Sequence, residues 1–377
     1  MIERMQDMLR EAARLTSSGR LRDATTLIQH SLRVKTAPII PKAPPVDDNM
    51  TIEGTFQIID TPGEYTDFTD PPPQNAPTGD KESGFFSGTY GCSSGERAYK
   101  LYVPHAYQGQ PLPLLVMLHG CKQNPDDFAA GTDMNSIGEH HQCFVLYPGQ
   151  SSQANSSGCW NWFRHSDQQR GYGEPAIIAG MTQEIMWRYG IDNKRVYVAG
   201  LSAGGAMALV MGTTYPDIYA AVGVHSGIPY AAATDIPSAL AAMQQGLGKR
   251  EKRSGRQSTT NTLPTIVFHG DSDKTVHPMN GDQVIKQAQA GFDNGTTPNP
   301  STRQEKVPDG RHYSVTVHHN EKSEPSIEHW VIHGAGHAWS GGSTQGSYTD
   351  SLGPNASQEM VRFFLQHPAP PSGSLRD

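Results

Sequence analysis

The sequence predicts an α/β fold with a mostly parallel central sheet, preceded by an N-terminal helical hairpin and a proline-rich linker. From about residue 88 onward, short runs of apolar and β-branched residues alternate with helical patterns. This alternation favours a parallel sheet that is covered by helices on both faces. A Gly-x-Ser-x-Gly motif at residues 200–204 lies where a strand pattern changes into a helical pattern. The 377-residue chain is also long enough to bury a large core.

The segments before the main domain differ from it in composition. Residues 1–35 contain two apolar stripes at helical spacing, separated by Ser18 and Gly19, and predict a small helical hairpin. The hairpin either packs on the main domain or docks to a partner, a second subunit or a polymer granule. Residues 36–87 hold nine prolines and nine acidic residues and predict a linker. We expect the main domain to span residues 88–367 and residues 368–377 to form a disordered tail.

The elements of the main domain are expected in the alternating order of an α/β fold. Helices are expected at residues 174–189, 203–212 and 357–365. Strands are expected at residues 97–103, 114–118, 143–147, 196–199, 220–225, 265–268, 313–318 and 328–332. Two stretches are expected to be surface loops, at residues 228–263 and 293–311. The first contains a basic run at 249–256, for which a lid or a site for an acidic partner is the alternative.

The motif Gly200-Leu-Ser202-Ala-Gly204 has the sequence surroundings of a nucleophile elbow. The apolar residues 196–199 before it suit a buried strand, and the residues after it, rich in alanine and methionine, suit a helix. A sharp turn between strand and helix exposes the serine hydroxyl, and it needs glycines because side chains would collide there. We therefore predict Ser202 as a nucleophile.

A serine hydroxyl becomes reactive when a base takes its proton and a carboxylate orients that base. His337 ends a glycine-rich loop after a predicted strand, which singles it out among 16 histidines as the base. The polar turn after the strand at 265–268 holds two carboxylates; we favour Asp273 as the acid and keep Asp271 as the alternative. These candidates follow the carboxyl ends of strands, the edge at which open α/β sheets bind ligands. Three histidines at strand ends are expected to support the site: His119, His225 and His269.

Backbone amides are the expected stabilisers of the negative charge that develops in acyl transfer. The amide of Ala203, directly after the serine, is one expected donor. The early strand at 114–118 ends in a His-Gly turn, and the amide of Cys121 after this turn is the second.

These segments together resemble the motif set of the polyhydroxybutyrate depolymerase family of esterases. Five motifs carry the resemblance, at residues 118–124, 159–163, 200–205, 269–273 and 334–342. The resemblance implies an α/β-hydrolase fold in which Ser202, Asp273 and His337 form a catalytic triad and Cys121 contributes to the oxyanion hole. The family is related to feruloyl and acetylxylan esterases, so the resemblance is less specific for the substrate than for the family.

The resemblance also implies that three tryptophans lie near the acyl or alcohol site. Trp160, Trp162 and Trp339 all fall in loops beside the catalytic motifs. Because small-ligand sites are mostly apolar, we predict that these side chains form a wall against the substrate.

The four cysteines, Cys92, Cys121, Cys143 and Cys159, leave two interpretations open. A reducing cytosol favours free thiols, whereas four cysteines also allow three different pairings. Cys121 with Cys159 is the most suggestive pair, because a disulfide there would brace the oxyanion loop against the aromatic segment.

Composition argues against several other functions. A net charge of −7 gives no reason to expect nucleic acid or an acidic membrane as partner. No run of 18 apolar residues and no recognisable secretory signal occur, so we expect a cytoplasmic protein, with secretion as the alternative if the sequence is trimmed. Neither a metal-binding nor a phosphate-binding motif is visible, so no cofactor is expected.

The sequence therefore predicts a serine carboxylic-ester hydrolase that works through an acyl-enzyme. The expected substrate is poly- or oligo(3-hydroxybutyrate) or a similar short-chain polyester. Alternatives are an acetyl, feruloyl or general short-chain esterase and, from another class, a non-catalytic granule-associated binding protein.

Overall fold

The computed structural model describes residues 83–246, 263–290, 299–320 and 324–370. The predicted hairpin at 1–35, almost all of the predicted linker, the basic run at 249–256 and most of the predicted tail lie outside these ranges. The hairpin, its boundary with the linker and the linker up to residue 82 therefore stay predictions.

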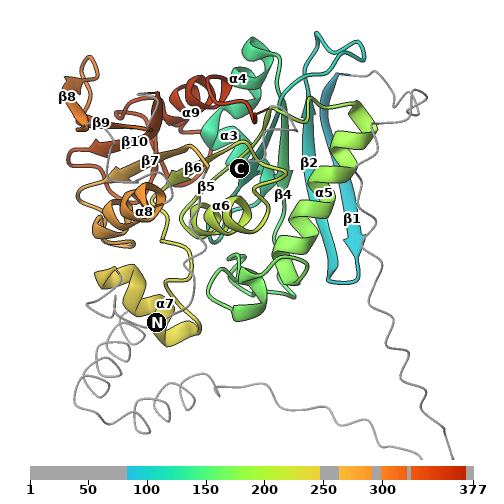
Figure 1. Ribbon diagram of the computed structural model, residues 1–377, viewed down its shortest axis with the longest axis horizontal. Helices are drawn as coiled ribbons and strands as arrows, with labels where there is room; N and C mark the ends of the chain where they lie inside the picture. Colours follow the sequence, from blue (N-terminus) through green and yellow to red (C-terminus); the bar gives the residue numbers. More distant parts are fainter. Residues whose placement is uncertain (1–82, 247–262, 291–298, 321–323, 371–377) are drawn as a thin grey trace, which may run out of the picture. The chain divides into compact units, whose positions relative to one another are not determined.

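The described residues alternate between strands and helices, as the sequence predicts (Figure 1). The strands are β1 (Gly84–Cys92), β2 (Gly95–Val103), β3 (Leu114–Leu118), β4 (Phe144–Pro148), β5 (Val196–Leu201), β6 (Ala221–His225), β7 (Thr265–Gly270), β8 (Ser301–Lys306), β9 (His312–His319), β10 (Pro325–Ile332), β11 (Trp339–Ser340) and β12 (Thr349–Asp350). The helices are α3 (Pro125–Thr132), α4 (Met134–His141), the 3-10 helix η1 (His165–Gln168), α5 (Gly173–Tyr189), α6 (Ala203–Thr214), α7 (Ile236–Gln245), α8 (Met279–Gln289) and α9 (Ala356–Leu365).

Ten strands form one sheet in the order β1-β2-β4-β3-β5-β6-β7-β10-β9-β8. The central strands from β4 to β10 are parallel, and antiparallel pairs extend the sheet at both ends. The predicted mostly parallel sheet is thus confirmed. Because the parallel strands share one carboxyl edge, the segments after β3, β5, β6, β7 and β10 meet there.

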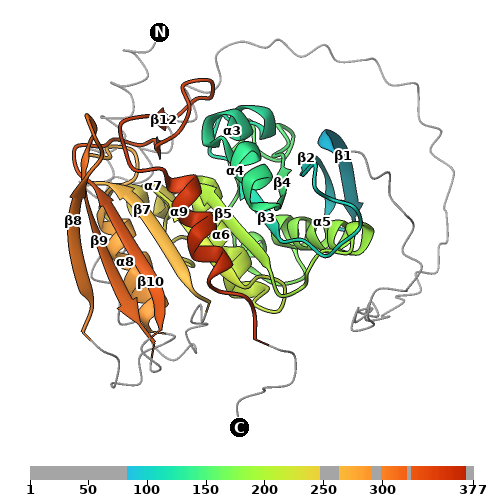
Figure 2. The ribbon, with the colours of Figure 1, turned by 90° about the horizontal axis from the view of Figure 1, so that it is seen from above.

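Helices cover both faces of this sheet and bury two apolar cores (Figure 2). One core joins α5, α6, α7 and α8 to strand residues such as Val198 and Val267. The other joins α3, α4 and α9 to strand residues such as Ala199 and Phe268 on the opposite face. The central strands are therefore buried on both sides, which explains their continuous apolar sequences.

Three expectations about the periphery need correction. Strand β1 begins inside the range predicted as linker, because its alternating half-buried residues pair with β2 along the whole strand. The predicted loop at 293–311 contains β8, an edge strand whose side chains are all exposed, so no apolar alternation marks it. The predicted loop at 228–263 contains α7, which begins at a capping box formed by Asp235 and Ser238.

Candidate active site

Ser202 occupies the sharp turn between β5 and α6. Its backbone has φ 57° and ψ −117°, in the positive-φ region that non-glycine residues rarely adopt. The turn is held because the Ser202 amide donates to the carbonyl of His225 at 2.8 Å. A Cβ on Gly204 would lie 2.0 Å from the carbonyl oxygen of Leu118, so only glycine lets α6 approach the end of β3. The backbone between β5 and α6 therefore has the geometry of the predicted elbow.

Asp273 and His337 form a buried pair across the loops that follow β7 and β10. The Nδ1 atom of His337 lies 2.7 Å from Oδ2 of Asp273, whose side chain is fully buried. Because a carboxylate oxygen accepts, His337 donates through Nδ1, and its Nε2 atom is left as the proton acceptor. The amides of Thr275 and Val276 donate to the other carboxylate oxygen at 2.8 and 2.9 Å.

These contacts keep the Asp273 carboxylate ionised. Burial alone would raise its pKa, but hydrogen bonds from His269 and His337, the charge of His337 and the amide of Val276 together hold the pKa well below its usual range. The pair thus has the charge needed to orient an imidazole and to stabilise it when it carries a second proton.

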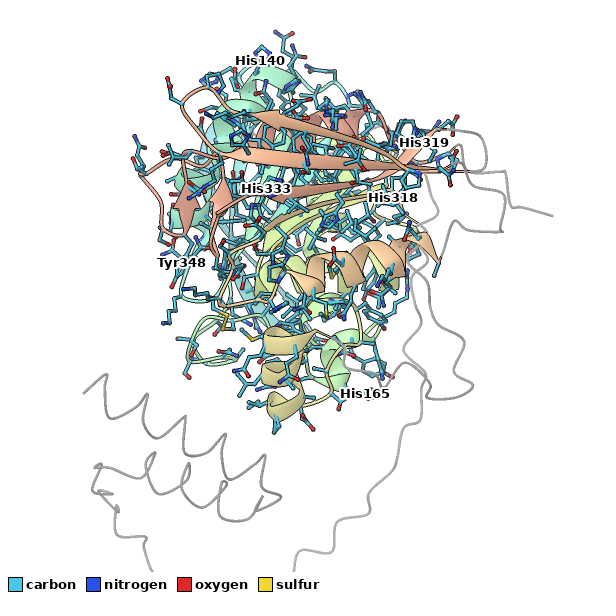
Figure 3. The ribbon with its side chains drawn as sticks, turned by 90° about the vertical axis from the view of Figure 1, so that its left-hand side faces the viewer. His140, His165, His318, His319, His333 and Tyr348 are labelled. Atoms are coloured by element: carbon cyan, nitrogen blue, oxygen red, sulfur yellow. A yellow bond between two sulfur atoms is a disulfide. The ribbon has the colours of Figure 1, made fainter. Side chains whose placement is uncertain are left out.

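The alternative acid, Asp271, has a different histidine. Its Oδ2 atom lies 2.9 Å from Nδ1 of His333, and its Oδ1 atom accepts the amide of Gly334 at 2.7 Å. His333, which is labelled in Figure 3, follows the end of β10. Its Nε2 atom lies 2.8 Å from the hydroxyl of Ser314. Both side chains of this pair are about 40% exposed. The favoured and the alternative aspartate are therefore divided between a buried and a partly exposed pair.

The turn after β3 is fixed so that the Cys121 amide has one orientation. His119 accepts the amide of Gln150 at Nε2, so its proton is on Nδ1, which donates to the carbonyl of Gly120 at 2.8 Å. Burial lowers the pKa of His119 to about 4, so the ring is neutral. In the trans peptide between Gly120 and Cys121, the N–H points opposite to this carbonyl. The Cys121 amide therefore points away from His119.

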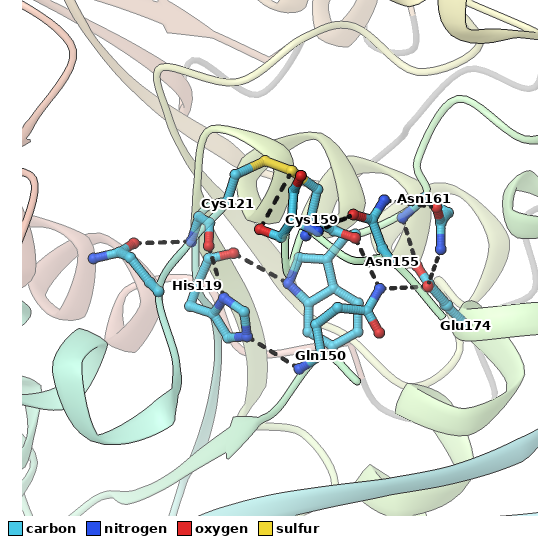
Figure 4. Close-up of a disulfide and its surroundings, with 11 residues drawn as sticks. His119, Cys121, Gln150, Asn155, Cys159, Asn161 and Glu174 are labelled. Carbon is cyan, nitrogen blue, oxygen red and sulfur yellow. Dashed lines mark hydrogen bonds between the residues drawn. A yellow bond between two sulfur atoms is a disulfide. The ribbon is translucent and has the colours of Figure 1, made fainter. Parts of the chain in front are cut away.

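A disulfide joins this turn to the segment before Trp160. Cys121 and Cys159 are bonded, whereas Cys92 and Cys143 are free. Figure 4 shows the disulfide together with Gln150 and Glu174, which bond to the same segment. Of the two interpretations of the cysteines, the structure therefore has the bridge between the predicted oxyanion loop and the aromatic segment.

A buried carboxylate holds the segment on the other side of the disulfide. Glu174 accepts from the amide and the side chain of Asn161 at 2.7 and 2.6 Å and from Gln150 at 2.5 Å. Arg97 lies 3.5 Å from the same carboxylate. Burial raises the pKa of Glu174 even though these hydrogen bonds oppose the shift. The segment that carries the disulfide is thus anchored by a network of polar groups.

The three tryptophans that are predicted to form a wall against the substrate have buried side chains. Trp160 and Trp339 are 0% and 1% exposed, and Trp162 is 6% exposed. The indole of Trp160 donates to the carbonyl of His119, and that of Trp339 donates to the hydroxyl of Ser357. Their loops lie beside the catalytic motifs, but the rings point into the protein and support those loops from behind.

Sequence reasoning missed a polar bridge between the turn after β3 and the loop that carries His337. Gln123 accepts the amide of Gly120 and donates to Asp127, both at 2.9 Å. Asp127 also accepts the amide and the hydroxyl of Ser347, at 2.9 and 2.6 Å. No sequence signal connects these residues, because the bridge joins segments more than 200 positions apart.

Among the described residues, no helix is long and apolar enough to cross a membrane. In the same part of the chain, no group of three or more histidine, cysteine, aspartate or glutamate side chains is arranged to hold a metal ion.

The parallel sheet, the strained serine after β5 and the Asp–His pair at the same sheet edge define an α/β-hydrolase. The chain belongs to the esterase PHB depolymerase family, whose family model matches residues 97–307, more than half of the sequence. The resemblance seen in the motifs is thereby confirmed.

Known proteins of this kind resemble parts of the chain. It is 35% identical over 242 residues to poly(3-hydroxyalkanoate) depolymerase C of Paucimonas lemoignei, an alignment that covers 62% of this chain and 57% of that protein. It is 28% identical over 200 residues to feruloyl esterase B of Thermothelomyces thermophilus, covering 50% of this chain and 67% of that protein. The chain therefore spans little more than half the length of the Paucimonas protein.

Among solved structures, an acetyl xylan esterase from Aspergillus awamori has a similar fold. Its TM-score is 0.52 at 23% sequence identity, and the match covers 64% of this chain and 89% of that one. This likeness supports the α/β-hydrolase fold.

Proposed function

We propose that the protein is a carboxylic-ester hydrolase in which Ser202 attacks the ester, His337 is the general base and Asp273 orients the base. The observation that carries this proposal is the buried Asp273–His337 pair at the same sheet edge as the strained Ser202. A nucleophilic serine is identified by the base beside it and the carboxylate that orients the base, whatever the order of the three residues in the sequence.

The reaction proceeds in two acyl transfers. His337 takes the hydroxyl proton of Ser202 as its oxygen bonds to the ester carbonyl carbon, and the amides of Cys121 and Ala203 stabilise the oxyanion. His337 then gives the proton to the departing alcohol, which leaves an acyl-enzyme. Water repeats the sequence: His337 takes its proton, the hydroxide oxygen attacks the acyl carbon, and Ser202 leaves with the proton.

For the substrate we favour poly- or oligo(3-hydroxybutyrate) or a similar short-chain polyester. Support comes from the family and from the depolymerase among the relatives. The second candidate is an acetyl or feruloyl ester, because relatives with lower identity are named feruloyl esterase B and acetylxylan esterase A. A binding protein without catalysis is disfavoured, since it would not need Asp273 held ionised against His337.

The test is hydrolysis of four substrates side by side: a soluble 3-hydroxybutyrate trimer, amorphous poly(3-hydroxybutyrate), acetylated xylan and a feruloyl ester. Ser202→Ala is the control, and its melting temperature should match the wild type. Release of 3-hydroxybutyrate from the trimer and the polymer, lost in the variant, supports the depolymerase. Cleavage of only the other two esters would move the protein to the second candidate. No cleavage of any ester, or full activity in Ser202→Ala, would contradict the proposal.

A further inference from the structure

A histidine outside the Asp–His pair connects the two halves of the site. His225 is the last residue of β6 and pairs with Leu201 of the neighbouring strand β5. Its backbone carbonyl accepts the amide of Ser202 at 2.8 Å. The main chain of this residue therefore helps to hold the nucleophile in its turn.

The ring of the same residue holds the loop that carries the base. The Nε2 atom of His225 accepts the amide of Ser340 at 2.9 Å. The ring also stacks between Phe268 and Trp339, with centroid distances of 5.8 and 5.1 Å and interplanar angles of 12° and 27°. Ser340 and Trp339 follow His337 closely in the sequence, so this ring helps to hold the base loop, together with bonds from the same two residues to Ser357 and Pro354.

The hydrogen bonds define the protonation state of the ring. A backbone amide only donates, so Nε2 of His225 carries no proton, and the proton of the neutral ring lies on Nδ1, 3.2 Å from the hydroxyl of Ser226. Burial lowers the pKa of His225 well below its usual value, and nearby His269 and His337 lower it further. The ring therefore adds no positive charge beside His337 when that residue is protonated during turnover.

We propose that His225 is a positioning residue that keeps the base loop within reach of Ser202, through its carbonyl on one side and its Nε2 acceptor on the other. The proposal rests on the proposed function, because it assigns His337 the role of base. Small displacements of a catalytic group have large effects: a shift of about 1 Å can cost on the order of 10²-fold in rate.

Two amide substitutions separate the role of the acceptor from a general need for a polar residue. In His225→Gln the carbonyl oxygen lies about as far along the side chain as Nε2 and can accept the Ser340 amide. In His225→Asn the side chain is shorter, so it keeps a polar group near Ser226 and loses the bond to Ser340. The matched control is His329→Asn, which removes a largely buried imidazole from β10 that has no hydrogen-bond partner at Nε2.

The experiment measures kcat and KM on a soluble short-chain nitrophenyl ester, and hydrogen–deuterium exchange of residues 337–342. We expect His225→Asn to lower kcat by about 10- to 100-fold, with KM changed less than about threefold and faster exchange in the loop. His225→Gln should recover most of kcat and the protection, and His329→Asn should leave both unchanged. Unaltered exchange in His225→Asn, or kcat equally low in both His225 variants, would overturn the proposal.

Hydrogen–deuterium exchange distinguishes a failure of the proposed function from a failure of the role proposed for His225. If the wild type cleaves no ester, the proposed function fails, while loop protection still reports whether His225 holds the segment. If the wild type is active and the His225→Asn loop exchanges as slowly as the wild-type loop, only the role of His225 is wrong.

Discussion

At the scale of single residues, burial distinguishes the two aspartates that share one turn in the sequence. Asp273 is fully buried against His337, whereas Asp271 is half-exposed against His333. Replacing Asp273 by Asn removes the charge that stabilises the protonated base, so we expect kcat/KM to fall by on the order of 10³-fold or more. Asp271→Asn is the matched control and should cost less than about tenfold. Comparable losses in both variants, with melting temperatures unchanged, would contradict this division of roles.

Two serines are candidates for a Ser/His/Asp arrangement, and only one has the surroundings of a nucleophile. Ser202 has a positive φ and precedes the first amides of α6. Ser314 lies 2.8 Å from His333 but sits within strand β9, without a helix start behind it. A fluorophosphonate probe followed by peptide mass spectrometry should label Ser202 and leave Ser314 unmodified, because labelling needs a stabilised oxyanion. Persistent labelling of Ser202→Ala at Ser314 would show a second reactive site.

At the scale of elements, several contacts fix the turn after β3, and the disulfide is one of them. Removing it with Cys121→Ser and Cys159→Ser opens a link across 38 positions, for which chain entropy predicts a loss of about 3–4 kcal/mol in unfolding free energy. Because His119 and Gln123 still hold Gly120, kcat should fall by about tenfold or less. Loss of an oxyanion donor would cost more, on the order of 10²-fold. Urea unfolding and steady-state kinetics check both numbers, with Cys92→Ser as the control. A double variant as stable as the wild type would refute the bracing role.

Sequence patterns predicted the buried elements well and the exposed ones poorly. The central strands and the helix after Ser202 carry continuous apolar runs, which burial on both faces imposes. Strand β8 pairs with β9 through its backbone and buries none of its side chains, so its polar residues predict a loop. Composition gives a signal only where side chains are buried, and no side chain of β8 is buried.

At the scale of the whole molecule, the order of strands brings the candidate residues to one edge, whereas the sequence indicated only that each of them follows a strand. Ser202, Asp273 and His337 follow β5, β7 and β10, which share one carboxyl edge. What the sequence could not indicate is the direction of each side chain. The tryptophans beside the motifs turn inward, and the bond from Asp127 to Ser347 joins distant segments. Such details depend on packing that no local pattern encodes.

Buried histidines make the stability of the whole domain sensitive to acid. Burial lowers the pKa of both His119 and His329 to about 4, whereas an unfolded histidine titrates near 6.5. As pH falls below 6.5, the unfolded chain takes up protons that the folded protein excludes, so the free energy of unfolding decreases. Each of these two imidazoles should cost about 2 kcal/mol between pH 6.5 and pH 5, and His225 acts in the same direction. Glu174, whose pKa is raised by burial, opposes the trend only where carboxylates titrate.

The measurement is urea unfolding at several pH values between 7.5 and 4.5. In the wild type we expect the free energy of unfolding to decrease steadily below pH 6.5. His329→Asn removes one of the excluded protons and should make this decrease shallower by about 1.2 kcal/mol per pH unit between pH 6 and pH 5. If the free energy of unfolding of the wild type stays constant from pH 7 to pH 5, these histidines take up protons in the folded protein as well. The rings of His119 and His225 would then be charged in the folded protein.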